Sequence, residues 1–408
     1  ILKDKQYYKF CFYGFLKNLR FFEPFFILYF MSKGISFLQI GILYSVREIA
    51  INVFEIPSGI IADALGRRVT LASSFLIYII AFIIFYLYSS FILFIVAMLF
   101  YALGDAIRSG INKAMIVDYL KRTEQIKFKV EYYGHTRSTS QFGSAISSLA
   151  GGALLFFHEN LEAIFLFSII PYILDFFNVL SYPKYLDESH GKKLSTKQNI
   201  LFISKSFLLA FKNKSLLHSL INSASYSGYY KAIKDFIQPF LKSLILSIPI
   251  LLFLTDDEKT ALFLALIYFA IFIVNSIVSR RASKIENLFS SQISFLNFSL
   301  ILGIVIGLLS GILMEYFNSV FSVALFIIVL SIENGRKPSG VANITDNSNK
   351  EVHAGILSVQ SQFASLFAAV LMLSIGFLSD IYSVGIGIAV VSFVLLLLYP
   401  IMRVKNLQ

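Results

Sequence analysis

The sequence predicts an all-α membrane protein with twelve transmembrane helices, arranged as two pseudo-symmetric bundles of six helices. Three observations lead to this fold class. Hydrophobic residues make up 57% of the 408 residues and charged residues only 14%, a composition typical of membrane proteins. Apolar stretches of about 20 residues, long enough to span a bilayer, recur along the chain with short polar breaks. Two motifs of the first half also return in the second half.

The predicted helices follow from these apolar stretches, taken in chain order. In the first half they lie near residues 8–30, 37–62, 69–88, 91–119, 132–156 and 160–182. In the second half they lie near residues 215–240, 259–283, 293–313, 317–343, 353–375 and 381–402. Residues 241–254 are either a longer external loop or an interfacial segment.

A polar segment rich in Lys and Ser separates the two halves, and this composition is typical of a linker. We therefore predict an N-terminal six-helix bundle at residues 1–182, a cytoplasmic linker at 183–214 and a C-terminal six-helix bundle at 215–408.

The internal repeat supports this division. GFLKNLRFFEPFF at residues 14–26 is echoed by GYYKAIKDFIQPF at 228–240, and SQFGS at 140–144 is echoed by SQFAS at 361–365. Both matches pair a helix with the sixth helix after it, as a duplication of six helices predicts.

The net charge of +11 comes mostly from short loops on one side of the predicted helices. The opposite side carries the acidic stretch Thr255–Glu258. Because Lys and Arg are enriched in cytoplasmic loops, we expect a multi-pass protein of the cell (inner) membrane with both termini and the linker in the cytoplasm. This distribution also argues against a nucleic-acid partner.

The single cysteine, Cys11, excludes an intramolecular disulfide and a Cys-based metal cluster. The sequence contains no His-Glu-x-x-His, no Gly-x-Ser-x-Gly and no phosphate-binding glycine loop. We therefore expect no catalytic residue, no metal and no cofactor, and neither an ATP-driven pump nor a hydrolase. We also expect the protein to be a monomer in the bilayer.

The loop after the second predicted helix reads GIIADALGRR. It resembles the cytoplasmic loop motif of the major facilitator superfamily, Gly-x-x-x-Asp-x-x-Gly-Arg-Arg, although Ala64 stands where that family usually has a basic residue. The resemblance implies a transporter fold in which this motif latches the two halves in the outward-facing state. It assigns the latch to Gly59, Asp63, Gly66, Arg67 and Arg68. Plain positive-inside charge would explain the arginines but not the spacing of the glycine and the aspartate.

The fifth predicted helix carries four glycines, at positions 134, 143, 151 and 152. Their spacing is similar to a motif of antiporters in the same superfamily, but Ser147 and Ser148 replace its Gly-Pro pair. The alternative is that small residues simply let membrane helices approach closely. The pattern is therefore only a hint of export.

Charged residues inside the predicted helices suggest the substrate. Lys17 and Arg20 are three residues apart and share one face of the first helix with Gly14, and Glu23 extends that face by another turn. Such charges cost several kcal/mol in the bilayer unless they face a cavity or a partner. The family's geometry places the first helix across the central cavity from the seventh, and hence Lys17 and Arg20 opposite Lys231 and Lys234.

Basic residues outnumber acidic ones in the predicted helices, which favours an anionic substrate such as a carboxylate or phosphate. The candidate substrate-binding residues are Lys17, Arg20, Arg47, Arg108, Arg137, Lys231, Lys234 and Arg336. The candidate proton-coupling residues are Glu23, Glu48, Asp105 and Glu333. The alternative for each is an internal salt bridge, for which Asp105 with Arg108 and Glu333 with Arg336 have suitable helical spacing.

We therefore predict a secondary active transporter of the major facilitator type, proton-coupled, that moves a small organic anion by alternating access. The first alternative is a proton-antiport exporter of amphipathic drugs or metabolites. A receptor or scaffold built on a transporter fold is a further alternative, which predicts binding without flux.

Overall fold

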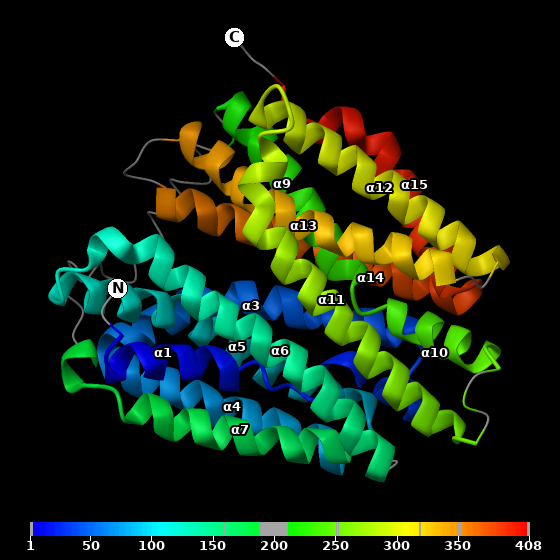
Figure 1. The fold of residues 1–408 in the computed structure, drawn as a ribbon, viewed down its shortest axis with the longest axis horizontal. Helices are drawn as coiled ribbons and strands as arrows, with labels where there is room; N and C mark the ends of the chain where they lie inside the picture. Colours follow the sequence, from blue (N-terminus) through cyan, green and yellow to red (C-terminus); the bar gives the residue numbers. More distant parts are fainter. Residues whose placement is uncertain are drawn as a thin grey trace. The chain divides into compact units, whose positions relative to one another are not determined.

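The computed structural model describes residues 3–158, 160–187, 211, 213–249, 251, 253–317, 320–348 and 353–405, and within them every regular element is helical (Figure 1). The first part of the chain contains α1 (Lys5–Leu16), η1 (Glu23–Phe25), α2 (Phe26–Ser32), α3 (Phe37–Leu65), α4 (Arg67–Leu87), α5 (Phe91–Arg122), η2 (Ile126–Phe128), α6 (Lys129–His158), α7 (Ala163–Leu180) and η3 (Lys184–Asp187). The second part contains α9 (Lys214–Ile233), α10 (Ile237–Ser247), α11 (Asp256–Glu286), α12 (Gln292–Phe317), α13 (Val320–Asp346), α14 (His353–Ile381) and α15 (Val384–Met402).

Each of the twelve predicted membrane segments corresponds to a helix or to a broken pair of helices. Nine helices of the described chain are long and apolar enough to cross a membrane on their own. The other three segments are the broken pairs α1/α2 and α9/α10, and α13, which carries several charged residues. The ambiguous stretch after residue 240 begins inside a helix, because α10 extends to Ser247.

The prediction of continuous first and seventh helices is wrong, because both are interrupted within the repeated motif. α1 ends at Leu16 and α9 ends at Ile233. Proline has no N–H, so Pro24 and Pro239 cannot donate the helical bond to the residues four positions earlier, Arg20 and Asp235. Those two carbonyls instead accept bonds from the residue just before each proline, at 3.0 and 3.1 Å respectively. The two halves thus break in the same way.

The chain forms two compact units. The first consists of Ile1–Tyr29, Ala50–Thr196 and Leu251–Ile273, and the second of Phe30–Ile49, Lys197–Ile250 and Val274–Gln408. Helices α3 and α11 each contribute residues to both units. These two units differ in their boundaries from the bundles at 1–182 and 215–408, and that division remains a prediction.

Aromatic side chains fill the core of the first unit, where α4 lies beside α7 (Figure 1). The ring of Phe22 stacks on Phe165 at 4.9 Å, and Phe82 meets the edge of Tyr172 at 4.9 Å. In the second unit α9 packs on α14, and α12 lies beside α15 (Figure 1). Large buried rings contribute much apolar area per residue, which suits a chain with 43 Phe and 22 Tyr.

The two repeated motifs pack against each other in both units. In the first unit, a Cβ on Gly14 would lie 2.9 Å from Ser140 Oγ, at the start of SQFGS on α6. In the second, a Cβ on Gly228 would lie 2.8 Å from the carbonyl oxygen of Ala364, inside SQFAS on α14. Glycine therefore permits the same close helix contact at equivalent places.

Candidate functional site

Charged side chains gather around one carboxylate in the first unit. We call this group the Asp105 cluster, formed by Arg20, Tyr78, Asp105, Arg108 and Tyr172. Asp105 Oδ1 accepts from Arg108 Nη2 at 2.7 Å and from Arg20 Nη2 at 3.3 Å, and it also accepts the Tyr78 hydroxyl. Arg20 Nε donates to the Tyr172 hydroxyl at 2.8 Å, and Arg108 Nε to the Tyr78 hydroxyl at 3.1 Å. The predicted pair of Asp105 with Arg108 is present.

The break after α1 places Arg20 in this cluster. Its guanidinium carbon lies 5.6 Å from the ring centre of Tyr78 and 5.2 Å from that of Tyr101. Aromatic faces attract cations, most strongly where water is excluded. Arg20 is therefore held by a carboxylate, a phenol hydroxyl and two ring faces, all from helices distant in sequence.

Lys17 lies beside this cluster without an ion pair. Its ammonium nitrogen is 4.9 Å from the ring centre of Tyr13, and no carboxylate of the described residues lies within 4.0 Å of it. Three cations, Lys17, Arg20 and Arg108, thus share a region with one paired carboxylate, Asp105.

Sequence analysis missed a second carboxylate in this region, Asp175 on α7. It is fully buried, at 0% exposure. Its Oδ1 accepts from Asn178 Nδ2 at 3.0 Å, whereas its Oδ2 has no hydrogen-bond partner among the described residues. Lys17 and Arg108 are its charged neighbours. The available signal was an aspartate in the middle of the sixth predicted apolar stretch.

The second unit contains a group that we call the Glu48 cluster, formed by Arg47, Glu48, Lys231 and Ser365. Glu48 is 3% exposed. Its Oε2 accepts from Lys231 Nζ at 2.7 Å and from Ser365 Oγ at 3.0 Å, and its Oε1 accepts from Arg47 Nη2 at 3.2 Å. Arg47 also lies over the ring of Tyr44 at 4.8 Å. One carboxylate therefore joins two cations from α3 and α9, and Ser365 belongs to the repeated SQFAS motif.

Glu333 and Arg336 lie one helical turn apart on α13, but they form no ion pair with each other. Glu333 accepts from Ser227 Oγ at 2.6 Å. Arg336 Nη2 donates to Asn222 Oδ1 at 2.6 Å, and its guanidinium lies 4.6 Å from the ring centre of Tyr226. Both partners come from α9, so each of the two charged groups is bonded to a neutral side chain of that helix.

The remaining predicted site residues lie apart from these groups. Lys234 Nζ is 3.7 Å from Asp235 Oδ1, next to the break after α9. Arg137 on α6 has an exposed side chain. Glu23 begins η1, so it does not extend a helical face shared with Lys17, and that part of the prediction is wrong. In the described part of the chain, no three His, Cys, Asp or Glu side chains converge in a metal-binding arrangement.

Lys17 and Arg20 belong to the first unit, and Lys231 and Lys234 to the second. The juxtaposition of these two pairs across a cavity remains a prediction.

The two arginines of the latch motif form ion pairs with carboxylates of the first unit. Arg67 forms an ion pair with Asp118 at the end of α5. Arg68 Nε lies 3.1 Å from Asp187 Oδ2, and the Arg68 backbone N–H donates to Asp187 Oδ1 at 2.8 Å. Gly66 has a φ of +93°, which favours glycine and lets the chain turn beside Asp187. The side chains at positions 59 and 63 of the motif, Gly59 and Asp63, lie outside the described residues.

Close packing accounts for most of the glycine pattern of α6. Gly143 faces the backbone of Phe15, and Gly151 faces the backbone of Phe21, where a Cβ would collide with carbonyl oxygens. Gly134 has no atom within 4 Å of an added Cβ. Three of the four glycines, with Gly152 against Ala261, therefore serve helix contact, which is the alternative to the antiporter interpretation.

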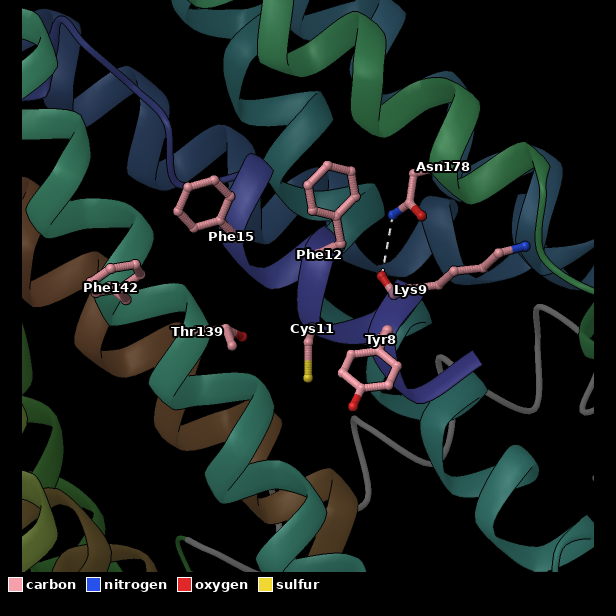
Figure 2. A pocket seen from close by; sticks show the side chains of 8 residues that line it. All are labelled: Tyr8, Lys9, Cys11, Phe12, Phe15, Thr139, Phe142 and Asn178. Carbon is pink, nitrogen blue, oxygen red and sulfur yellow. Dashed lines mark hydrogen bonds between the residues drawn. The ribbon is translucent and has the colours of Figure 1, made fainter. Parts of the chain in front are cut away.

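An apolar pocket of about 440 Å³ lies among α1, α6 and α7 (Figure 2). Phe12, Phe15 and Phe142 form much of its wall, and the dashed line in Figure 2 joins Asn178 Nδ2 to the Lys9 carbonyl oxygen at 3.2 Å. None of the predicted substrate-binding residues lines it. The Asp105 cluster and the Glu48 cluster, and not this pocket, are therefore the two candidate sites, one in each unit.

Comparisons with known proteins agree on the family. The model described as Major Facilitator Superfamily matches residues 10–332. "Uncharacterized MFS-type transporter YxaM" of Bacillus subtilis (strain 168) is 30% identical over 227 residues, which is 55% of each chain. The match thus spans about half the length of this curated relative.

The solved structures that resemble this chain are also transporters. The nucleoside transporter NupG has a TM-score of 0.77 at 16% identity, covering 99% of this chain and 100% of that one. A POT family transporter in complex with a thioalcohol-conjugated peptide has a TM-score of 0.71 at 16% identity, covering 98% and 96% respectively. At such identities the likeness shows the fold alone.

Proposed function

The chain belongs to the major facilitator superfamily, and on this premise we propose that it is a proton-coupled secondary transporter of a small organic anion. The family is one of membrane transporters rather than of enzymes, and the apolar helices suit a multi-pass membrane protein. The substrate class, the coupling ion and the direction of transport are the proposed parts.

The observation that carries the proposal is the charge balance of the groups in and around the Asp105 cluster. Lys17, Arg20 and Arg108 are opposed by Asp105 and Asp175, which leaves one positive charge in excess. A buried cation without a counter-charge is costly, so an anionic ligand would stabilise this region. Guanidinium groups bind carboxylate and phosphate with two parallel hydrogen bonds, while Lys17 would contribute a point charge.

The Glu48 cluster has the same sign of imbalance, with Arg47 and Lys231 against one carboxylate. Protonation of Glu48 would remove the carboxylate partner of Lys231 and leave that ammonium group available for an anion. This exchange would link proton binding to substrate binding. Glu23, Asp105 and Glu333 are the other proposed proton-coupling groups.

The orientation and state of the protein complete the proposal. We place the chain in the cell (inner) membrane as a monomer, with its basic loops and both ends of the sequence on the cytoplasmic side, on the strength of the positive-inside distribution. Alternating access about a site midway through the membrane would move the substrate.

The proposal is tested with purified protein in liposomes that contain a pH-sensitive dye. The probes are succinate, citrate, glucose 6-phosphate, uridine, a dipeptide, glucose and tetraphenylphosphonium. Uridine and the dipeptide are included because nucleoside and peptide transporters share the fold. We expect an anion to evoke proton flux in the unmodified protein.

Lys17→Gln should reduce that flux by about tenfold or more, because it removes the cation that has no carboxylate partner. Lys5→Gln, the same change at the exposed start of α1, is the matched control and should leave it unchanged. Flux evoked by tetraphenylphosphonium alone would establish the exporter instead, and flux with uridine or the dipeptide alone would refute the anion.

A further inference from the structure

Asp175 is a fully buried carboxyl group, and one of its oxygens has no hydrogen-bond partner in the part of the chain that the structure describes. Buried polar atoms are nearly always paired, with protein or with ordered water. An ionised carboxylate has four acceptor sites and no donor, whereas a protonated one can donate from the oxygen that lacks a partner. The geometry therefore suits a group that binds a proton.

Titratable groups face Asp175 from α1, from α5 and from the end of α7. α1 contributes Lys17 and Tyr13, α5 contributes Arg108, and Tyr182 follows the end of α7. α4 packs on α7 through Phe75 and Phe82 against Tyr172, and its Tyr78 is held by Asp105. The carboxyl thus has two cations near it, and neither of them forms an ion pair with it.

Tyr13 adds a second buried polar atom without a partner. Its ring is 0% exposed, and its hydroxyl has no hydrogen-bond partner among the described residues. Because Tyr13 and Asp175 are electrostatic neighbours, two unsatisfied polar groups share one region of the core. Water between them would satisfy both.

Buried hydroxyls continue from here toward the start of α1. Tyr132 and Tyr119 are 0% and 1% exposed; the Tyr132 hydroxyl has no hydrogen-bond partner among the described residues, and the Tyr119 hydroxyl is near Asp4. Their ring centres lie 6.0 Å apart. Phe10 lies among them, with its ring centre 5.1 Å from Tyr182, 6.2 Å from Tyr132 and 5.8 Å from Tyr119.

The series ends at Asp4, a half-buried residue that neighbours Tyr119 and caps α1 through the Tyr7 N–H at 2.8 Å. We call Tyr13, Tyr182, Tyr132 and Tyr119 the phenol column, in which the Tyr182 hydroxyl donates to the Lys9 carbonyl oxygen at 3.3 Å. It connects Asp175 in the core to the end of the first unit where α1 begins.

We propose that Asp175 is a proton-binding group of the transporter, and that water along the phenol column carries protons between it and the end of the unit at Asp4. A proton taken from that water binds Oδ2 of Asp175 and returns to water on release. Binding neutralises the carboxyl, so the excess of positive charge around Lys17 rises from one to two. The inference deepens the proposed function, on which it rests for the use of the proton in anion transport.

Infrared difference spectroscopy between two pH values tests the carboxyl directly on the purified full-length protein. A carboxylic acid band that appears at the lower pH should be absent in Asp175→Asn, whose side chain can still accept from Asn178. It should persist in Asp257→Asn, the same change at the exposed start of α11. Asp175→Glu keeps a carboxyl and should move the band. A band that Asp175→Asn leaves unchanged would overturn the inference.

The phenol column is tested by the rate of proton uptake after a pH jump. Tyr132→Phe removes a hydroxyl that has no protein partner, so it should fold normally and slow uptake by about tenfold or more. Tyr229→Phe in the second unit, whose hydroxyl is bonded to Ser392 at 2.6 Å, is the control. Unchanged uptake in Tyr132→Phe and in Tyr119→Phe would overturn the path.

The liposome assay separates this inference from the proposed function. If Asp175→Asn shows the same anion-evoked proton flux as the unmodified protein, the inference fails and the anion transporter stands. If the infrared band belongs to Asp175 but no anion evokes flux, the proton site stands and the proposed substrate class fails.

Discussion

The Glu48 cluster allows a double-mutant cycle with a calculable outcome. Glu48 accepts from both Lys231 and Arg47, so Glu48→Gln leaves two cations beside a neutral side chain. Removing one partner of a buried ion pair costs about 3–5 kcal/mol. We expect the cost of Glu48→Gln to lie in the lower part of this range, because the Lys231 side chain is 33% exposed and water screens its charge.

Lys231→Met should cost less, because Glu48 keeps its contacts with Arg47 at 3.2 Å and with Ser365 at 3.0 Å. The loss is that of one charge-assisted hydrogen bond, about 1.5–3 kcal/mol. In the double mutant no lysine is left without its carboxylate. The loss in free energy of unfolding should therefore be smaller than the sum of the two single losses by about 1–3 kcal/mol.

Thermal unfolding of the purified protein in detergent measures the cycle. A coupling of about 2 kcal/mol corresponds to about 4–8 °C for a domain the size of one unit. Glu48→Gln combined with Lys214→Met is the control, because Lys214 is exposed at the start of α9 and should be additive. Additivity of the Glu48 and Lys231 changes to within about 0.5 kcal/mol would refute the argument that they share one buried charge balance.

Three further changes test the remaining features. Arg20→Lys keeps the charge but loses the planar group that binds Tyr172 and two rings, so transport should fall by about tenfold in the liposome assay; normal flux would contradict a role for the guanidinium. Gly143→Val should overpack the helix contact and cost about 1–3 kcal/mol of stability, which lowers the midpoint of thermal unfolding by several degrees. Gly134→Val has open space around it and should leave the midpoint unchanged, and equal effects of the two changes would contradict the packing explanation. Arg67→Ala should destabilise the protein by about 1–3 kcal/mol because Asp118 loses its partner, and Asp118→Asn in the same background should recover part of the loss; a larger loss in the double mutant would contradict the pairing.

Much of the fold could be predicted from the sequence because apolar length decides which segments cross a bilayer. All twelve predicted segments have helical counterparts, and the repeated Gly14 and Gly228 lie at equivalent helix contacts. The breaks after α1 and α9 were missed, although the prolines were visible. A proline alone does not determine whether a helix kinks or stops, since this depends on what its neighbours bind.

The candidate site could be predicted only as a set of residues, not as a set of contacts. Arg20 and Asp105 were assigned separate roles for substrate and proton, and the structure joins them at 3.3 Å. Glu333 and Arg336 have the spacing of a pair, yet each binds a neutral group on α9. The rotation of each helix about its axis, which tertiary packing determines, decides which carboxylate a cation meets.

The shared break of the first and seventh segments has an electrostatic consequence. Lys17 is the C-cap residue of α1, and Lys234 is the C-cap residue of α9. The carbonyl groups at the end of a helix carry a partial negative charge that stabilises a nearby cation by about 0.3–1 kcal/mol, and more where water is excluded. This counter-charge belongs to the backbone and cannot be protonated. The backbone therefore gives each of these lysines a part of its compensation that is independent of pH, which for Lys234 adds to the Asp235 carboxylate at 3.7 Å.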